Sequence, residues 1–313
     1  MVKTIVTLLD AITDKECKAY TSAVVANPRE IFDAHTITID EFEYKTLVET
    51  KQGSFNFRNI NGVAKTTLPE YDIRRFECSV GNPHLDIDMP LWDLAQNMTG
   101  KAGNMIARQK ASIINGVYEK LGQVFYYGKT VDSKGVDGLS SIVTKELTFN
   151  GGGNTANSQS SIWLISWGEL DVSVVYGGGV GKNFSWSEFQ DRLVQTSNGE
   201  ATHKWAYLRM YPMVVVARPN CVARICNVES ITDAKLYKVL AECEENGFVP
   251  DCIYMRPTIL ETLRAARTAT NPTGAAAPIP EEVCGGIPVH TTLSISKAEA
   301  VVAGGSCNGL SLS

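Results

Sequence analysis

Residues 91–127 read LWDLAQNMTGKAGNMIARQKASIINGVYEKLGQVFYY, and this stretch decides the fold. Its apolar residues recur at steps of three, four and seven, which predicts a long amphipathic helix with one buried face. Asp93 or Thr99 can cap its start, and Gly128 follows where helices commonly end in a left-handed residue. The apolar positions are Met98, Ala102, Met105, Ile106, Ile113, Val117, Leu121, Val124 and Phe125.

A helix of this length is long for a compact domain. At about 1.5 Å per residue it spans on the order of 45–55 Å, whereas helices in globular proteins average roughly 11–12 residues. Gly100, Gly103, Gly116 and Gly122 lie inside the pattern. Each costs about 1 kcal/mol relative to alanine, which leaves a bend or a break open. The length favours an elongated subunit over a globule built around a small pocket.

The composition of the 313 residues is that of an ordinary soluble protein, with 44% hydrophobic and 20% charged residues. The net charge of −5 argues against a dedicated DNA-binding surface, because such surfaces need an excess of Lys and Arg on one face. No signal peptide begins the chain, and no apolar run approaches the roughly 20 residues of a membrane span. We therefore expect a protein made in a cytoplasm, with no membrane partner.

The cysteines are widely and irregularly spaced, and no CxxC pair occurs among them. Cys221 and Cys226 are too far apart for a zinc knuckle. We interpret the set as reduced, mostly buried thiols rather than disulfides. The eight positions are 17, 78, 221, 226, 243, 252, 284 and 307.

The N-terminal part of the chain predicts an arm followed by a long two-stranded excursion. Val2–Leu9 is apolar, and Asp10–Ala26 has a helical pattern that ends at Asn27-Pro28. From Thr36 to Val80 the pattern is strand-like, and Asn61-Gly62 is a strong turn signal. Because an isolated hairpin is marginal in water, the excursion is expected to lie on something, plausibly another subunit.

Strands and two helices follow the long helix. Ser160–Gly168 predicts a strand buried on both faces. Thr258 and Glu261 have the spacing of a capping box at the start of the second helix. The remaining segments are strands at Val172–Tyr176, Lys204–Val216, Val222–Ile225, Ile253–Met255 and Gly286–His290, and helices at Thr232–Glu245 and Thr258–Thr268.

The glycine-rich stretch Gly177–Lys182 invites comparison with a phosphate-binding loop. Such a loop needs glycine where Tyr176 stands and Ser or Thr where Asn183 stands, and Lys182 also breaks a G-x-G-x-x-G pattern. We interpret this stretch as a surface turn or a disordered loop.

The other candidate chemical residues form no recognisable catalytic or metal-binding set. His35, His84, His203 and His290 are scattered; we interpret His203 as exposed and polar, and His290 as a packed or exposed strand end. Cys284 lies near His290, but nothing places the orienting acid that an activated thiol needs. The acidic pairs Glu244-Glu245 and Glu281-Glu282 favour a solvated face, and Arg74-Arg75 favours an intersubunit salt bridge. We predict no catalytic residue, no metal site and no cofactor.

Several stretches together, in order, resemble the major capsid proteins of tailed bacteriophages. The helix ends at an aromatic pair and Gly128, and Val136-Asp137-Gly138-Leu139 follows. Then come Ser160–Gly168, with SIW and WG, and Val222–Val228, with RI and N. The likeness continues through Arg256-Pro257-Thr258 and Gly285–Val289, and it covers roughly residues 30 to 300. Relatives often carry a YPKGS segment where this chain has Tyr176–Gly181, so no role of that loop transfers.

The resemblance implies an α+β fold of the Hong-Kong-97 type. Residues 1–40 would form the N-terminal arm and residues 41–76 the extended β-hairpin loop. Residues 77–219 would form the peripheral domain, with the long spine helix and a β insertion. Residues 220–290 would form the axial domain, and residues 291–313 the C-terminal segment. Some shells of this fold cross-link through Lys and Asn side chains, but no matching pair can be assigned in this sequence.

The function that follows is that of a structural subunit of an icosahedral bacteriophage capsid, not an enzyme. Its copies would self-assemble into hexamers and pentamers in the host cytoplasm and enclose double-stranded DNA. Portal, scaffolding or decoration proteins would be further partners. Two alternatives stay open: the shell protein of a bacterial nanocompartment, which shares this fold, and a cytosolic enzyme that uses Cys284 or the Gly177 loop.

Overall fold

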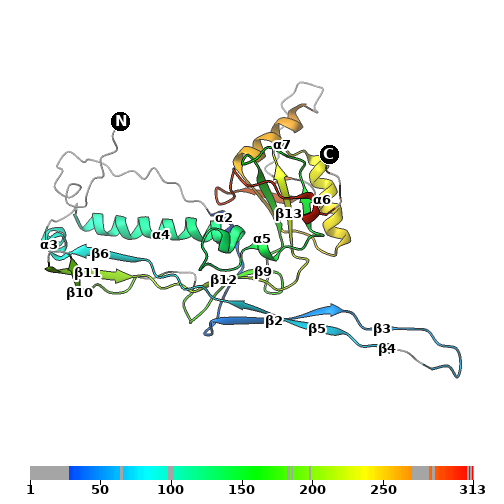
Figure 1. The fold of residues 1–313 in the computed structure, drawn as a ribbon, viewed down its shortest axis with the longest axis horizontal. Helices are drawn as coiled ribbons and strands as arrows, with labels where there is room; N and C mark the ends of the chain where they lie inside the picture. Colours follow the sequence, from blue (N-terminus) through cyan, green and yellow to red (C-terminus); the bar gives the residue numbers. More distant parts are fainter. Residues whose placement is uncertain are drawn as a thin grey trace.

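The computed structural model describes residues 28–63, 66–97, 102–181, 184, 186–196, 199–269, 282–283, 286–308, 310 and 312. The segments Val2–Leu9 and Asp10–Ala26 lie outside these residues. The molecule is elongated (Figure 1). Helix α4 (Ala102–Tyr127) extends to one side of the body and a two-stranded ribbon to the other. The ribbon consists of β2 (Glu43–Lys51) and β5 (Glu70–Glu77), and the body carries α6 (Asp233–Glu245) and α7 (Pro257–Ala269).

The predicted single long helix is present as two. Helix α3 (Met89–Asn97) precedes α4, which has 26 residues, and residues 98–101 between them are not described. Asp93 is inside α3, so it caps neither helix. The buried face of α4 follows the predicted period, with Ile106, Val117, Val124 and Phe125 buried. Thr99, the other candidate cap, lies outside the described residues.

Two glycines at the end of α4 allow close packing. A Cβ at Gly122 would overlap the Ser294 hydroxyl and the Glu30 carboxylate. Gly128 has a φ of +54°, the left-handed conformation predicted for the residue after the helix, and a Cβ there would overlap the backbone of Gly138. The aromatic end of the helix is therefore joined tightly to the segment that follows it.

The strands near the middle of the molecule form a small mixed sheet. Strand β9 (Val172–Tyr176) pairs in parallel with β1 (Thr36–Thr38) and antiparallel with β12 (Pro212–Val216). Residues 28–40, the described part of the range expected to be an arm, thus join the body. Helix α2 (Arg29–Asp33) buries Ile31 beside this sheet.

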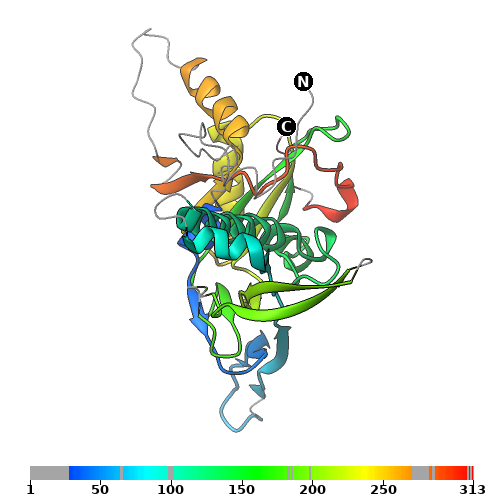
Figure 2. The same cartoon turned by 90° about the vertical axis from the view of Figure 1, so that its left-hand side faces the viewer.

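A second sheet lies under the outer part of α4. Strand β11 (Gly199–Tyr207) pairs antiparallel with β6 (His84–Asp88) and β10 (Gln190–Thr196). Figure 2 looks toward α4 from its outer end and shows β10 and β11 projecting to one side. The predicted strand Lys204–Val216 is wrong as a single element, because β11 ends at Tyr207 and β12 starts at Pro212 in a different sheet.

The largest sheet has six strands, and the motifs of Ser160–Gly168 and Val222–Val228 lie in two of its inner strands. Strand β8 (Ser160–Ile165) lies between β13 (Val222–Val228) and β14 (Cys252–Met255) and is antiparallel to both. The outer strands are β7 (Thr148–Asn150), β16 (Ile287–Thr291) and β15 (Glu282–Val283), in the order β15-β16-β14-β8-β13-β7. Because β7 and β8 come from before residue 220, the expected division between peripheral and axial domains runs through this sheet.

Strand β8 separates two hydrophobic cores, as its sequence predicts. All six of its residues are buried. Trp163 and Ile165 face the main core, which also contains the end of α4, β9 and β12, while Ile162 and Leu164 face a second core. The second core is covered by α6 and α7. In a strand with two buried faces, apolar and polar residues do not alternate, because the side chains on both faces are removed from water.

The ends of the two covering helices differ in how well the sequence predicts them. Thr232 caps α6 by accepting a hydrogen bond from the Lys235 backbone N–H at 3.4 Å. The capping box at Thr258 is wrong, because α7 already starts at Pro257, a residue favoured at the first helical position. The remaining short elements are β3 (Ser54–Phe55), β4 (Thr66–Thr67), η1 (Gly128–Thr130), α5 (Leu139–Ile142) and η2 (Gly304–Ser306).

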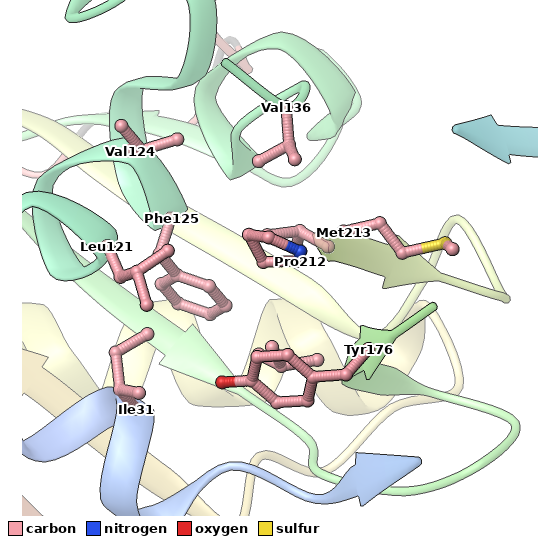
Figure 3. A pocket seen from close by; sticks show the side chains of 10 residues that line it. Ile31, Leu121, Val124, Phe125, Val136, Tyr176, Pro212 and Met213 are labelled. Carbon is pink, nitrogen blue, oxygen red and sulfur yellow. The ribbon is translucent and has the colours of Figure 1, made fainter. Parts of the chain in front are cut away.

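The main core contains a small apolar cavity between α2, α4 and the sheet of β9 and β12 (Figure 3). Its volume is about 10 Å³. Ile31, Phe125, Tyr176 and Met213 are among the side chains that line it. Ligand pockets are typically about 300–1,000 Å³, so this cavity is a packing defect and holds no substrate.

Candidate assembly surface

The ribbon of β2 and β5 is exposed over most of its length. The two strands pair antiparallel from Glu43–Glu77 to Lys51–Glu70, and Leu47 lies opposite Ile73. The ribbon projects away from the body (Figure 1). Two strands alone are marginally stable in water, so the ribbon depends on what holds its base and on what it touches elsewhere.

The base of the ribbon is held firmly by the body. Tyr44 and Phe76 pack against the main core. The Arg74 guanidinium donates a hydrogen bond to the Val216 carbonyl oxygen at 3.0 Å, and the Cys78 N–H donates to the Phe42 carbonyl oxygen at the same distance. The direction in which the ribbon leaves the body is therefore fixed at its first residues.

The tip of the ribbon carries large apolar side chains that contact little of the chain. Phe57 and Ile60 are each 95% exposed, and Phe55 packs only edge-on against Phe57 with ring centroids 5.2 Å apart. The turn at Asn61-Gly62 is present as predicted, with Asn61 at a φ of 66°. Exposed apolar clusters of this kind mark association surfaces. Phe55, Val63 and Leu68 are further exposed side chains near the tip, and Leu47, Tyr71 and Ile73 are exposed along the two strands.

Charged residues along the ribbon balance each other within the chain. Lys51 forms an ion pair with Glu70 at 2.8 Å, and Lys45 with Glu43 at 3.1 Å. The Arg75 guanidinium lies 3.9 Å from Glu43. Exposed pairs of this kind contribute about 0–1 kcal/mol, so the ribbon gains little stability from them. The intersubunit role expected for Arg74-Arg75 stays a prediction, since both side chains have partners within the chain.

A cleft of about 580 Å³ separates β2 from the body. Residues 44–49 of the ribbon form one wall, and Leu170, residues 217–220 and Asn246-Gly247 form the other. An ion pair between Arg218 and Asp171 lies in this second wall. Leu47 and Leu170 are both exposed. The cleft therefore presents apolar surface beside the base of the ribbon.

The motif residues of the central sheet fasten the C-terminal part of the chain. Arg224 forms an ion pair with Glu299 at 2.8 Å, and the two side chains are 12% and 7% exposed. Glu299 also accepts hydrogen bonds from the hydroxyls of Tyr127, at 2.5 Å, and Ser161, at 2.6 Å. Burial, followed by the neighbouring Glu299 charge, raises the pKa of Tyr127, so its hydroxyl stays a donor.

Asn227 adds a second attachment. Its amide exchanges two hydrogen bonds with the backbone of Val302, at 2.9 and 2.8 Å, and its φ of 54° is left-handed. Sequence reasoning identified Arg224 and Asn227 as motif residues but found neither Glu299 nor Val302. No periodicity marks those positions, because residues 292–303 include no helix or strand beyond an isolated bridge of Glu299 with Gln159.

A third polar group joins α2 to the six-stranded sheet. Asp33 accepts hydrogen bonds from the His290 ring at 2.6 Å and from the Tyr254 hydroxyl at 3.1 Å. His290 lies within β16 and is packed, in agreement with one of the two interpretations of this residue. His203 differs from its interpretation as exposed, since it is partly buried in β11 and lies 2.8 Å from Asp86.

Glu30 is the most deeply buried charged residue described. Its carboxyl group lies against Gly122 of α4 and near Thr292 and Ser294. Burial raises its pKa, an effect that the two nearby hydroxyls offset only in part. Neither carboxylate oxygen has a hydrogen bond of good geometry to the described residues. Its burial therefore costs stability whenever the group is charged.

The glycine turn after β9 does not offer its backbone to a phosphate. The N–H groups of Gly177 and Gly179 donate to the carbonyl oxygens of Tyr211 and Ile39, each at 2.9 Å. Gly178 and Gly179 have positive φ values of 64° and 67°, and Gly177 is buried against Cys78. The stretch is thus a turn, in agreement with the first of its two interpretations, with Gly177 buried and Gly179 exposed. Lys182 lies outside the described residues.

The remaining candidates form no site in the part of the chain that is described. Cys284 and Glu281 lie outside it, and the side chain of Glu282 is not described. Glu244 and Glu245 are solvated at the end of α6, as expected. No three or more His, Cys, Asp or Glu side chains among the described residues are arranged to hold a metal ion. In the same residues, no helix has the length and apolar character needed to cross a membrane.

Two of the solved structures with a similar fold come from bacteriophages. The structure of bacteriophage Epsilon15 aligns with a TM-score of 0.62 at 18% identity, covering 97% of this chain and 99% of that chain. The capsid of bacteriophage JBD30, decorated with minor capsid protein trimers, aligns with a TM-score of 0.54 at 12% identity, covering 93% and 99%. No curated protein matches the sequence. The ribbon, the long helix and the six-stranded sheet thus define a fold of the Hong-Kong-97 type.

The sequence also matches the family described as Major capsid protein GP7 over residues 36–303. The chain therefore belongs to the GP7 family of major capsid proteins. It is a structural, non-enzymatic subunit of a bacteriophage capsid and self-assembles into that shell. The family match favours the capsid subunit over the nanocompartment shell and the cytosolic enzyme that the sequence left open.

Proposed function

We propose that the chain tiles the capsid as hexamers and pentamers in which each ribbon lies on a neighbouring copy. The single observation that carries this proposal is the tip of the ribbon, where Phe57 and Ile60 are almost fully exposed on a rigidly based projection. A ring of identical copies uses heterologous contacts, in which one surface of a copy meets a different surface of the next. The ribbon supplies one such surface, and the cleft beside β2 is a candidate for the other.

The domain roles follow from the same proposal. Residues 41–76 act as the extended loop, α4 as the spine of the peripheral domain, and the part with α6 and α7 as the axial domain around the ring centre. Residues 1–40 act as the N-terminal arm, whose end is anchored at α2, and residues 291–313 as the C-terminal segment. These assignments agree with the projection of α4 and the ribbon from the body in different directions (Figure 1).

The enclosed partner in this proposal is double-stranded DNA. An acidic subunit, with a net charge of −5, holds packaged DNA by confinement and not by tight contact. The shell assembles in the host cytoplasm, with portal, scaffolding or decoration proteins as further partners. Introducing Lys on the inner face should slow the release of DNA from filled particles, and unchanged release would contradict this part.

Electron microscopy of the purified, expressed chain tests the proposal. The expected result is closed shells or sheets whose class averages contain six-fold and five-fold rings, with density from each ribbon crossing onto an adjacent copy. A chain that stays monomeric at all concentrations and salt conditions, or rings in which the ribbon contacts only its own subunit, would refute it.

A further inference from the structure

Two cysteine thiols meet where the C-terminal part of the chain crosses the six-stranded sheet. The Sγ atoms of Cys226, in β13, and Cys307, just after η2, are 3.3 Å apart. Both residues are buried, and they are 81 positions apart in the sequence. The chain thus brings together two sulfur atoms that no sequence spacing relates.

The backbone on each side of this pair is fixed. Cys226 pairs in register with Asn150 of β7, and its thiol lies 3.2 Å from the Phe149 carbonyl oxygen. The Cys307 N–H donates to the Gly304 carbonyl oxygen at 3.2 Å, and the next N–H, of Asn308, donates to Thr148 at 2.6 Å. A disulfide has an S–S length of about 2.05 Å, so the two sulfur atoms have to approach each other by little more than about 1 Å.

The other described thiols do not share this arrangement. Cys221 is directed to the Arg218 carbonyl oxygen at 3.0 Å, and Cys252 lies 3.1 Å from the Trp167 indole N–H. Cys78 and Cys243 are free thiols in other parts of the structure. In the described residues, the contact of Cys226 with Cys307 is the one in which two sulfur atoms approach each other.

Both thiols are buried, although the segment directly before Cys307 is exposed. Residues 303–306, with two glycines in the short turn η2, are exposed and lie directly before Cys307. Burial, followed by the hydrogen bond with Cys307, raises the pKa of Cys226 to about 12, so little reactive thiolate forms at neutral pH. Because both sulfur atoms are buried, access of a small oxidant requires local opening of the chain, and a reducing environment keeps the pair as thiols.

We infer that Cys226 and Cys307 are an oxidisable pair that forms an intramolecular disulfide and clamps the C-terminal segment onto β13 when the protein meets a peroxide-class oxidant. One thiolate attacks a peroxide oxygen, hydroxide leaves, and a sulfenic acid forms. The second sulfur attacks the sulfenic sulfur and displaces water. Two thiol hydrogens and two electrons pass to hydrogen peroxide, which yields two molecules of water and one S–S bond.

The disulfide would close a loop that contains α6, β14, α7 and β16. Cross-links over loops of this length stabilise mainly by restricting the unfolded chain. For a chain of this size, the melting temperature of the oxidised protein should rise by about 5 °C. The clamp goes beyond the role of the chain in assembly, since it acts within one subunit.

The experiment treats the full-length chain, both unassembled and in particles, with hydrogen peroxide and then blocks free thiols. Trypsin cuts after Arg224, Lys235 and Lys297, so the disulfide joins peptide 225–235 to peptide 298–313. The expected result is this linked pair, 2 Da lighter than the sum of the two free peptides, together with the rise in melting temperature and its reversal by a reductant. Full alkylation of both cysteines after oxidation would overturn the inference.

Variants make the test specific. Cys226→Ser and Cys307→Ser should each abolish the linked peptides and the rise in melting temperature. The matched control, Cys17→Ser with Cys284→Ser, should retain both. If a serine variant fails to fold, the peptide map of the wild-type chain still decides. Linkage of Cys226 to any other cysteine would also contradict the inference, and because the readout is intramolecular, it is independent of whether shells form.

Discussion

Replacing Phe57 and Ile60 by alanine should separate the folding of the chain from its assembly. Both side chains are 95% exposed, so they contribute almost nothing to the stability of an isolated copy. If each is buried against a neighbour, it contributes about 1.5–3 kcal/mol there. Allowing for the area that alanine still buries, the double variant loses about 3–4 kcal/mol per subunit contact, a weakening of about 10²- to 10³-fold.

The assay has two arms. Sedimentation across a concentration series gives the lowest concentration at which particles form, and this threshold should rise strongly in the double variant. Denaturant unfolding of the unassembled chain should change by no more than about 0.5 kcal/mol. A matched control is Phe149→Ala, since Phe149 is buried in the second core and its truncation should lower the free energy of unfolding by about 3–5 kcal/mol.

The reasoning is refuted by either of two results. Particles that form at the wild-type threshold would show that the tip of the ribbon contributes no contact energy. A large loss of stability in the isolated double variant would show that the tip packs within its own chain, contrary to its exposure.

Three further predictions concern contacts that hold separate elements of the fold together. Replacing Arg224 by Met leaves the buried Glu299 carboxylate without its cation and should lower the free energy of unfolding by about 3–5 kcal/mol. Adding Glu299→Gln should recover part of this loss. An unchanged denaturation midpoint would contradict the prediction. Because the pKa of Glu30 is raised in the folded state, its contribution to the free energy of unfolding is favourable below its unfolded pKa and is lost as pH rises through the folded pKa. Glu30→Gln should therefore raise the melting temperature at pH 7–8 and leave it unchanged near pH 3. An equal effect at both pH values would exclude this explanation. Gly128→Ala places a side chain at a φ of +54° against the backbone of Gly138 and should lower the free energy of unfolding by at least about 1 kcal/mol. Chemical denaturation measures this change, and Gly304→Ala, where a Cβ meets open space, is the control.

Sequence patterns by themselves predicted those helices and strands in which each face packs against a single kind of surroundings along its length. The buried face of α4 repeats along the helix because its outer part packs on the second sheet and its end on the main core. Residues 162–165 of β8 are apolar at every position because each face of the strand meets a core. The turn at Asn61-Gly62 and the stop at Gly128 depend on backbone conformation that only a few residues adopt at low cost, so local sequence specifies them. The exposed ribbon was also predictable, since a strand pair with apolar and charged residues intermixed has no core of its own.

Only the tertiary structure decided which distant residues meet. Strand β10 is mostly exposed and polar, so no alternation announced it, and the division of Lys204–Val216 depends on two sheets that lie in different parts of the molecule. Glu30, Glu299 and Cys307 gain their partners from elements far away in the chain, where burial and hydrogen-bond geometry determine their energies. Local sequence specifies backbone conformation and the burial of faces that repeat along a helix or strand. The polar contacts join residues that are distant in the sequence, and no periodic pattern predicts them.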